Sequence, residues 1–384
     1  MARMLRSTIF LAKGLREFTR GGYERAAKRF DEAVLQRSLA GRRAMVTGAN
    51  QGLGYQTSLE LAKRGATLYM VCRNEERGRE AVERVRRDSG NSDVHLKART
   101  GCFGGVLLSS LQLTILRPPL AATVDQQVCD LASLAAIRAL AEEWLASGAP
   151  LDLLVNNAGL MLHERTPSAD GYETNFAVNT LGAFALTAAL EPALHAAGQP
   201  AAGTEAAAAG AAAGAAGSSG GPAGARVIFV SSGGQYTEPL EVEDLEAKGW
   251  KKFDGTRQYA RDKRRQIAIA ERFNERWEAA GKRTRAYAMH PGWTETDGVK
   301  TSIPGFYNAF KNKLRNLQQG CDTTVWLCLE DDSKLQPGGF YLDRQPQAKH
   351  LPLAGTSYSS ADVDRMWTAL AQLAAPALPH AQQS

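Results

Sequence analysis

Apolar residues in this chain form short continuous runs that alternate with longer amphipathic stretches. The short runs predict buried strands at residues 44–47, 67–72, 94–97, 151–156, 226–231, 285–289 and 340–342. The longer stretches repeat apolar positions every three or four residues and predict helices, notably at 53–64, 75–88, 131–146, 172–196 and 257–280. Strands that alternate with helices build a parallel sheet covered on both faces. The pattern therefore predicts an α/β fold, a doubly wound parallel sheet of about seven strands in a single domain of residues 41–376.

Two segments interrupt this alternation. Residues 98–127 form a long connection without an amphipathic pattern, which is uncommon inside a compact domain, and they are either a surface insertion or a translated intron. Residues 196–225 are nearly all Ala and Gly and predict a disordered loop. Residues 377–384 follow the last predicted element and form a short tail.

Residues 1–40 precede the first strand and form a basic amphipathic extension. Three interpretations stay open, namely a helix lying on a membrane surface, an import signal, and a helix that packs on its own domain. The two sides of the predicted helix are an apolar one with Met4, Leu11, Leu15 and Phe18 and a charged one with Arg6, Lys13, Glu17 and Arg20.

Composition narrows the class of protein. Residues 1–30 hold eight Lys and Arg against two Glu, which accounts for the whole net charge of +6, so the rest of the chain has no basic surplus for nucleic acid. No apolar run approaches the roughly 20 residues that span a bilayer. The five cysteines form no CxxC pair, so we expect no disulfide framework and no metal site, and an intracellular, reducing compartment, with membrane-surface or organellar placement left open: Cys72, Cys102, Cys129, Cys321 and Cys328.

A glycine-rich turn links the first predicted strand to the first long helix. It reads Thr47-Gly48-Ala49-Asn50-Gln51-Gly52-Leu53-Gly54, a TGxxxGxG spacing. Glycines let the backbone turn tightly and approach a pyrophosphate, and the N-terminus of the following helix offers free N–H groups and a partial positive charge. The turn therefore predicts a phosphate-binding site.

Polar residues follow two other predicted strands and one helix. Asn156-Asn157-Ala158-Gly159 ends the strand at 151–156, and Ser231-Ser232 ends the strand at 226–231. The carboxyl ends of parallel strands are where ligands bind in such sheets. Tyr259 and Lys263 lie one helical turn apart and can address one ligand.

These motifs, in this order and with His290-Pro291-Gly292-Trp293-Thr294-Glu295-Thr296, resemble the short-chain dehydrogenase/reductase family over residues 41–345. The resemblance implies a Rossmann-type fold. Within the family the chain is most similar to the retinol-dehydrogenase-like branch, on the basis of residues 71–74 and 130–133. Both insertions depart from that pattern.

The resemblance also implies catalytic roles. Tyr259 would protonate a carbonyl or take the proton of an alcohol, and Lys263 would favour its phenolate and bind the cofactor ribose. Ser232 would hold the substrate oxygen, with Ser231 as the competing serine. Asn179 matches the family asparagine that supports a proton-relay water.

The same resemblance assigns a nicotinamide cofactor site. Cys72 stands where an NAD enzyme carries an acid, and Arg73 follows it and can pair with a 2′-phosphate, so we expect NADP(H) to be preferred, with NAD(H) as the alternative. The expected surroundings are Gly48, Asn50, Gly52, Leu53 and Gly54 for the pyrophosphate, Asp130 and Leu131 for the adenine, Asn157 and Gly159 with Ala158 between them for the ribose, Thr296 for the carboxamide, and Pro291 and Gly292 nearby.

The leading hypothesis is an enzyme that transfers hydride between NADP(H) and a lipophilic carbonyl or alcohol, such as a fatty aldehyde, steroid or retinoid. Two alternatives remain, a protochlorophyllide-reductase-like NADPH enzyme and a non-catalytic NADPH-binding protein at a membrane surface. Residues 1–30 would supply the peripheral membrane contact. The family resemblance also allows a homo-oligomer.

Overall fold

An eight-stranded sheet runs through the centre of the computed structural model, which describes residues 2–97, 129–197, 223–352 and 354–382. The strand order is β3-β2-β1-β4-β5-β6-β7-β8, and each neighbouring pair is parallel except β7 with β8. The predicted doubly wound Rossmann-type sheet is therefore confirmed. The strands are β1 (Arg43–Thr47), β2 (Thr67–Val71), β3 (Val94–Lys97), β4 (Leu153–Asn156), β5 (Arg226–Val230), β6 (Arg285–Met289), β7 (Phe340–Leu342) and β8 (Gln345–Pro346).

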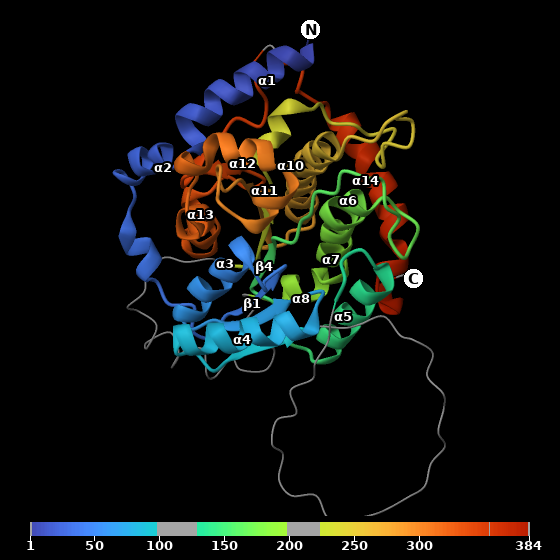
Figure 1. The fold of residues 1–384 in the computed structure, drawn as a ribbon. Coiled ribbons are helices and arrows are strands. Elements are labelled where there is room, and N and C mark those ends of the chain that lie inside the picture. The colour runs from blue at the N-terminus through green and yellow to red at the C-terminus, as the bar shows by residue number, and fades with distance from the viewer. Residues whose placement is uncertain (1, 98–128, 198–222, 353, 383–384) are drawn as a thin grey trace, which may run out of the picture.

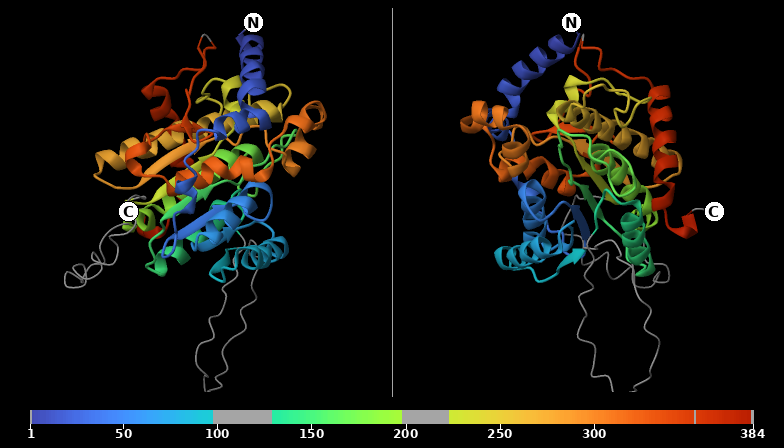
Figure 2. Two further views of the ribbon diagram at one scale, coloured as in Figure 1. Left: turned by 90° about the vertical axis from the view of Figure 1, so that its left-hand side faces the viewer. Right: turned by 45° about the vertical axis from the view of Figure 1, so that its right-hand side comes forward.

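Helices cover both faces of the sheet (Figures 1 and 2). One apolar cluster gathers side chains from α3, α4 and α13, and a second gathers side chains from α5, α7, α10 and α14. The helices are α1 (Ala2–Lys13), α2 (Arg20–Ala27), α3 (Gly52–Lys63), α4 (Glu75–Ser89), α5 (Leu134–Ala146), α6 (Thr174–Phe176), α7 (Ala183–Ala189), α8 (Glu191–Ala196), α10 (Gly255–Ala279), α11 (Asp297–Ser302), α12 (Pro304–Phe310), α13 (Leu317–Leu329) and α14 (Ser360–Ala374).

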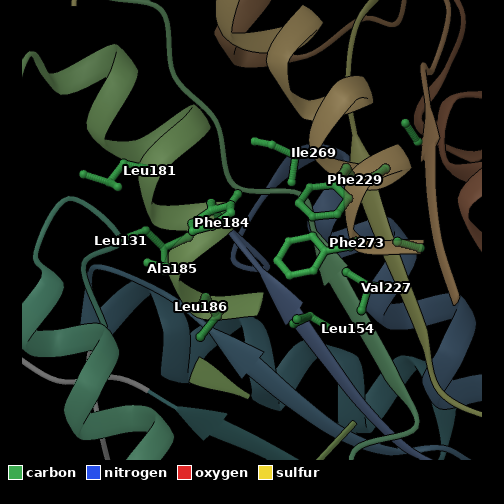
Figure 3. Packing of buried hydrophobic residues seen from close by; sticks show 14 of the residues in the cluster. Leu131, Leu154, Leu181, Phe184, Ala185, Leu186, Val227, Phe229, Ile269 and Phe273 are labelled. Carbon is green, nitrogen blue, oxygen red and sulfur yellow. The ribbon is translucent and has the colours of Figure 1, made fainter. Parts of the chain in front are cut away.

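Three phenylalanine rings lie among aliphatic side chains in the core between α10 and the sheet (Figure 3). Phe273 of α10 stacks on Phe229 of β5 with ring centroids 6.4 Å apart, and its centroid lies 5.5 Å from that of Phe184 on α7. All three side chains are buried. A buried Phe contributes about 3–5 kcal/mol when judged by truncation to Ala, so this cluster fixes α10 firmly on the sheet.

The helix predicted at 172–196 is interrupted in the structure. After α6 the chain makes one turn of π-helix (a π-turn), η3 (Ala177–Gly182), before α7 begins. Pro192 then stands in the first turn of α8, where it is tolerated because the N–H groups there have no partner within the helix. Apolar periodicity predicted the length of the segment but not this change of helix type.

Both predicted insertions fall mainly outside the described residues. Residues 98–128 and 198–222 are not described, so the expectations for 98–127 and for most of 196–225 are not addressed. Ala225, at the end of the second predicted segment, is described, and it is buried directly before β5.

The N-terminal extension packs against the sheet domain. Phe18 is fully buried, and its ring lies 4.5 Å from the ring of His290. Its carbonyl accepts hydrogen bonds from the Trp293 N–H and from Arg315, whose guanidinium also binds the carboxylate of Asp343. None of the described helices combines the length and apolar character needed to cross a bilayer.

Candidate active site

The glycine-rich turn lies at the carboxyl end of β1 and opens α3. Gly48 has φ of +62°, and a Cβ there would stand 2.9 Å from the Cα of Ala158, so only glycine fits. A Cβ on Gly54 would stand 2.3 Å from the Gly48 carbonyl oxygen and 2.4 Å from the Asn157 amide. The turn is thus pressed against the end of β4, and its bare backbone is available to a phosphate group.

The neighbouring predicted cofactor residues converge on this turn. Asn157 donates through its side-chain amide to the carbonyl of Thr47 at 2.9 Å, which ties β4 to the glycine turn. The methyl group of Thr296 would lie 3.9 Å from a Cβ on Gly52, so the loop after β6 approaches the same turn from the other side. The Cys129 N–H donates to the carbonyl of Cys72, which places the chain at 129–131 beside the end of β2.

Some predicted cofactor residues have structural partners as well. Leu131 is buried against Gly182, where a Cβ would stand 2.4 Å from the Leu131 carbonyl oxygen. The carboxylate of Asp130 accepts from the Ala132 N–H, as expected for a residue that starts a turn before α5. The carbonyl of Pro291 accepts from the Thr294 hydroxyl, and Gly292 has φ of +72°.

Cys72 and Arg73 follow β2 with opposite exposure. The Cys72 thiol is buried, and burial raises its pKa to about 12, so it stays neutral. The Arg73 side chain is exposed at the end of the strand. The edge of the site next to the glycine turn therefore carries a cation and, at the position of Cys72, no carboxylate.

Tyr259, Ser232 and Lys263 meet at the carboxyl end of β5. The Ser232 hydroxyl faces that of Tyr259 and favours its phenolate, and the Lys263 Nζ lies 5.4 Å from the centre of the Tyr259 ring. Tyr259 keeps part of its surface accessible, yet burial of its hydroxyl raises its pKa to about 12, an effect that the neighbouring Ser232 hydroxyl opposes. Ser231 turns the other way, and its buried hydroxyl donates to the Lys263 carbonyl at 2.6 Å.

Lys263 is almost completely buried on α10. Its Nζ donates to the carbonyl of Val230 at 2.7 Å and to Oε1 of Gln266 at 3.2 Å. Burial lowers its pKa to about 8, against a smaller opposing effect of the neighbouring Asp262 carboxylate. The pKa of Asp262, itself buried, is raised to about 7, although Arg265 lies 3.0 Å away.

Asn179 lies in the π-turn η3 and faces this group. Its side-chain amide exchanges two hydrogen bonds with the backbone of Leu160, both at 2.9 Å. A Cβ on Gly159 would stand 3.2 Å from Asn179 Oδ1 and 3.3 Å from Lys263 Nζ, so Gly159 lies between the two. The four residues predicted as catalytic, Asn179, Ser232, Tyr259 and Lys263, thus lie in one place.

Aromatic side chains flank the Ser232 end of the site. A Cβ on Gly233 would meet Phe18 at 2.9 Å and Phe10 at 3.4 Å, so the N-terminal segment reaches the residue after Ser232. Trp293 lies with ring centroids 5.0 Å from Phe306 and 4.9 Å from Phe310, both on α12. This aromatic wall joins α1, α12 and the loop after β6.

A doubly wound sheet with a glycine turn on β1 and a Ser–Tyr–Lys group on β5 and α10 defines a nicotinamide-type dehydrogenase fold. A family profile described as short chain dehydrogenase matches residues 42–98 and 117–204. Dehydrogenase/reductase SDR family member 12 of Bos taurus is 36% identical over 97% of this chain and 98% of its own length, and the Homo sapiens protein is equally similar. The chain therefore belongs to the short-chain dehydrogenase/reductase family of oxidoreductases.

More distant relatives and solved structures agree with this placement. Retinol dehydrogenase 12 of Mus musculus is 26% identical over 87% of both chains. A crystal structure of a Mycobacterium paratuberculosis protein superposes with a TM-score of 0.59 at 23% identity, covering 88% of this chain and 95% of the other. A Shigella flexneri 2A short-chain dehydrogenase, solved with NADP, gives 0.51 at 19% identity, covering 81% and 100%. At these identities the two structures establish the fold.

Sequence reasoning assigned no site role to three residues that shape the site, Gln266, Phe18 and Trp293. Gln266 follows Lys263 by three positions and Tyr259 by seven, a spacing that places all three on one helix face and could have drawn attention to it. Phe18 and Trp293 gave no comparable signal, because their contact joins segments 275 positions apart in the chain.

Proposed function

We propose that this protein is an NADP(H)-dependent enzyme that interconverts a lipophilic carbonyl compound and its alcohol. The observation that carries the proposal is the meeting of Ser232, Tyr259 and Lys263 beside a glycine turn that has no room for a Cβ at Gly48 or Gly54. One edge of the sheet can therefore bind a dinucleotide at the glycine turn, transfer a proton through Tyr259, and favour the Tyr259 phenolate through Lys263.

The residues present fit a dinucleotide. Gly48, Gly52 and Gly54 leave open backbone at the start of α3, where the helix dipole and free N–H groups favour a pyrophosphate. Lys263 and Gly159 would hold the ribose. When bound, the nicotinamide supplies or accepts the hydride.

The chain itself supplies the proton and its control. In reduction, the Tyr259 hydroxyl donates a proton to the substrate oxygen, and Ser232 holds that oxygen with a second hydrogen bond. In oxidation the same hydroxyl, as phenolate, accepts the proton. Burial disfavours the phenolate, so a nearby cation is needed, and the Lys263 ammonium stands over the ring.

Replacement of Tyr259 by Phe tests this role directly. We expect Tyr259→Phe to lower turnover by about a hundredfold or more while NADPH still binds, because general acid–base catalysis contributes on that scale. Tyr358→Phe is the matched control, since Tyr358 is a tyrosine whose hydroxyl binds Glu271 on another part of α10. Equal loss of turnover in both variants would contradict the assignment, and unchanged turnover in Tyr259→Phe would favour a non-catalytic protein.

The preference for NADP(H) rests on Cys72 and Arg73. A buried neutral thiol stands where a ribose-binding carboxylate would exclude a phosphate, and an exposed guanidinium follows it. A fluorescence titration with NADPH and then NADH should show tighter NADPH binding, and Arg73→Ala should reduce the difference. An unchanged ratio of the two affinities would show that Arg73 does not read the 2′-phosphate.

A lipophilic substrate is supported by the aromatic wall of Phe10, Trp293, Phe306 and Phe310 beside Ser232 and Gly233. Such rings contribute apolar contact area and few polar groups. We expect kcat/KM to rise along a series of aldehydes of increasing alkyl length. Equal values for long aldehydes and small water-soluble carbonyls would contradict this part of the proposal.

We also propose that the outer face of α1 and η1 (Gly14–Phe18) rests on an anionic membrane surface. Met4, Leu5, Leu11 and Leu15 are the exposed large hydrophobic side chains of the described residues, with 77%, 45%, 43% and 42% of their surface accessible. The adjacent Arg16 side chain is 82% accessible. Apolar side chains beside cations are the pattern of an interfacial helix.

Vesicle co-sedimentation of full-length variants tests the membrane contact. Leu11→Ser combined with Leu15→Ser, and separately Arg16→Ala, should reduce binding to phosphatidylserine-containing vesicles. Arg87→Ala on α4 removes a similarly exposed cation at the opposite end of the molecule and should have no effect (Figure 1). Equal binding of all four proteins would contradict the proposal.

A further inference from the structure

A glutamine side chain connects two predicted catalytic residues. Nε2 of Gln266 on α10 donates to the backbone carbonyl of Asn179 at 2.7 Å, and Oε1 of the same amide accepts from Lys263 Nζ at 3.2 Å. The amide thus spans the distance between the π-turn η3 and the lysine.

The Lys263 ammonium is oriented by these contacts. An ammonium group has three N–H donors, of which one points to the Val230 carbonyl and one to Gln266. Gly159 lies beside the same nitrogen, with a Cβ position 3.3 Å away, so the remaining donor direction borders the place where a ribose would lie. Without the Gln266 contact, the hydrogen bond to the Val230 carbonyl would be left to hold the ammonium group, and the group could move away from its present position.

Burial makes this contact energetically important. Gln266 and Asn179 are completely buried and Lys263 is 2% accessible, so water does not readily replace a lost partner. The titratable groups around the ammonium are Tyr259 and Asp262 on its own helix, whereas Asn179, Val230 and Gly159 on the facing segments are uncharged. A change at Gln266 therefore acts on an ammonium with few other polar partners.

We propose that Gln266 is a positioning residue that holds the charged Lys263 in place over Tyr259 by linking it to the Asn179 carbonyl. The kinetic consequence rests on the proposed function, but the effect on the charge of Lys263 does not. An amide acceptor stabilises the ammonium form, a leucine of similar size cannot, and a glutamate stabilises it further.

The first measurement is the pH titration of Lys263 in the cofactor-free protein. The titration is monitored by NMR of lysines labelled with ¹³C at Cε, and the Lys263 signal is identified by its loss in Lys263→Arg. Gln266→Leu should lower the midpoint by about one unit, and Gln266→Glu should raise it by a similar amount. Asn274→Leu is the matched control, because Asn274 is a buried amide on the same helix that bridges to β6. An unshifted midpoint in both Gln266 variants would overturn the proposal.

The second measurement is the pH dependence of alcohol oxidation. With Lys263 less charged, the Tyr259 phenolate is less favoured, so Gln266→Leu should lower kcat about tenfold or more and move the acidic limb of its pH profile, where Tyr259 becomes protonated, to higher pH. A loss of thermal stability with an unchanged profile would overturn the proposal and leave Gln266 a purely structural bridge. If the wild-type chain turned over no substrate, the proposed function would fail, and the lysine titration would still decide the role of Gln266.

Discussion

Lys263 is held in a place that costs the cofactor-free protein stability. Its pKa is lowered to about 8 by burial, while an exposed lysine titrates near 10.4. A shift of this size corresponds to about 3 kcal/mol at neutral pH, and the bonds to Val230 and Gln266 offset part of it. Such a cost is common where a charged side chain serves function and not folding.

Replacement of this lysine should therefore stabilise the protein while abolishing its activity. We expect Lys263→Met to raise the free energy of unfolding at pH 7 by about 1–2 kcal/mol, because an unbranched apolar side chain can be buried without removing a charge from water. Urea denaturation of the cofactor-free protein measures it. A less stable Lys263→Met variant at pH 7 would show that the hydrogen bonds of the ammonium outweigh its desolvation.

The pH dependence of that gain follows from the direction of the shift. The pKa of Lys263 is lower in the folded than in the unfolded chain, so the folded state is fully penalised below about pH 8. The penalty fades as the pH rises from there towards the pKa of the unfolded lysine. The advantage of Lys263→Met should therefore be smaller at pH 9.5 than at pH 7.

At the residue scale, the sequence predicted those site residues that their spacing along the chain reveals. Tyr259 and Lys263 are one turn apart on a helix, and the structure does bring them to the end of β5 with Ser232. Gln266 was not assigned, although it shares a helix face with Tyr259 and Lys263, because a buried glutamine on a helix is most often an ordinary satisfied polar residue. Its partner is a backbone carbonyl in a π-turn, which leaves no mark in the side-chain pattern.

At the scale of elements, long periodic segments were predicted well and their interruptions were not. The seven predicted strands are present, but the two-residue β8 was too short to detect. It returns after a turn in which Asp343 and Arg344 have φ of +50° and +57°, a conformation that these residues seldom adopt and that sequence alone does not suggest. The π-turn η3 was missed for a similar reason, since its residues are as apolar as those of a regular helix.

The junction between α1 and the sheet domain depends on one small residue. A Cβ on Gly14 would stand 2.2 Å from Cζ2 of Trp293, and both residues are buried. Gly14→Ala gains about 1 kcal/mol of helix propensity, but overpacking of this kind costs about 1–3 kcal/mol, so the clash should prevail.

We therefore expect Gly14→Ala to lower the melting temperature and to alter tryptophan fluorescence. Gly305→Ala on α12 is the matched control, because a Cβ at Gly305 would meet no atom within 4 Å. That variant should be neutral or slightly more stable. A Gly14→Ala protein as stable as Gly305→Ala would mean that α1 shifts freely and that its contact with Trp293 contributes little.

At the scale of the whole molecule, the N-terminal extension forms part of the fold. Three interpretations of residues 1–40 were open from the sequence, and the structure places this segment against the sheet domain (Figure 2). Phe18 belongs to the apolar cluster around α10, and Val34 and Leu39 belong to the cluster around α3. An amphipathic helix has the same pattern whether it meets its own domain or a lipid surface, so periodicity alone could not decide.

Removal of residues 1–40 should consequently damage folding. Loss of a buried Phe alone costs about 3–5 kcal/mol, which is a large part of the 5–15 kcal/mol that stabilises a typical domain. We expect the truncated chain to melt far below the full chain or to be insoluble. The full chain with Leu11→Ser and Leu15→Ser is the control, because these exposed side chains contribute little to the core, and its unfolding free energy should stay within about 1 kcal/mol. If the truncated chain melted with the full chain, the N-terminal segment would be an independent attachment that contributes little to the stability of the sheet domain.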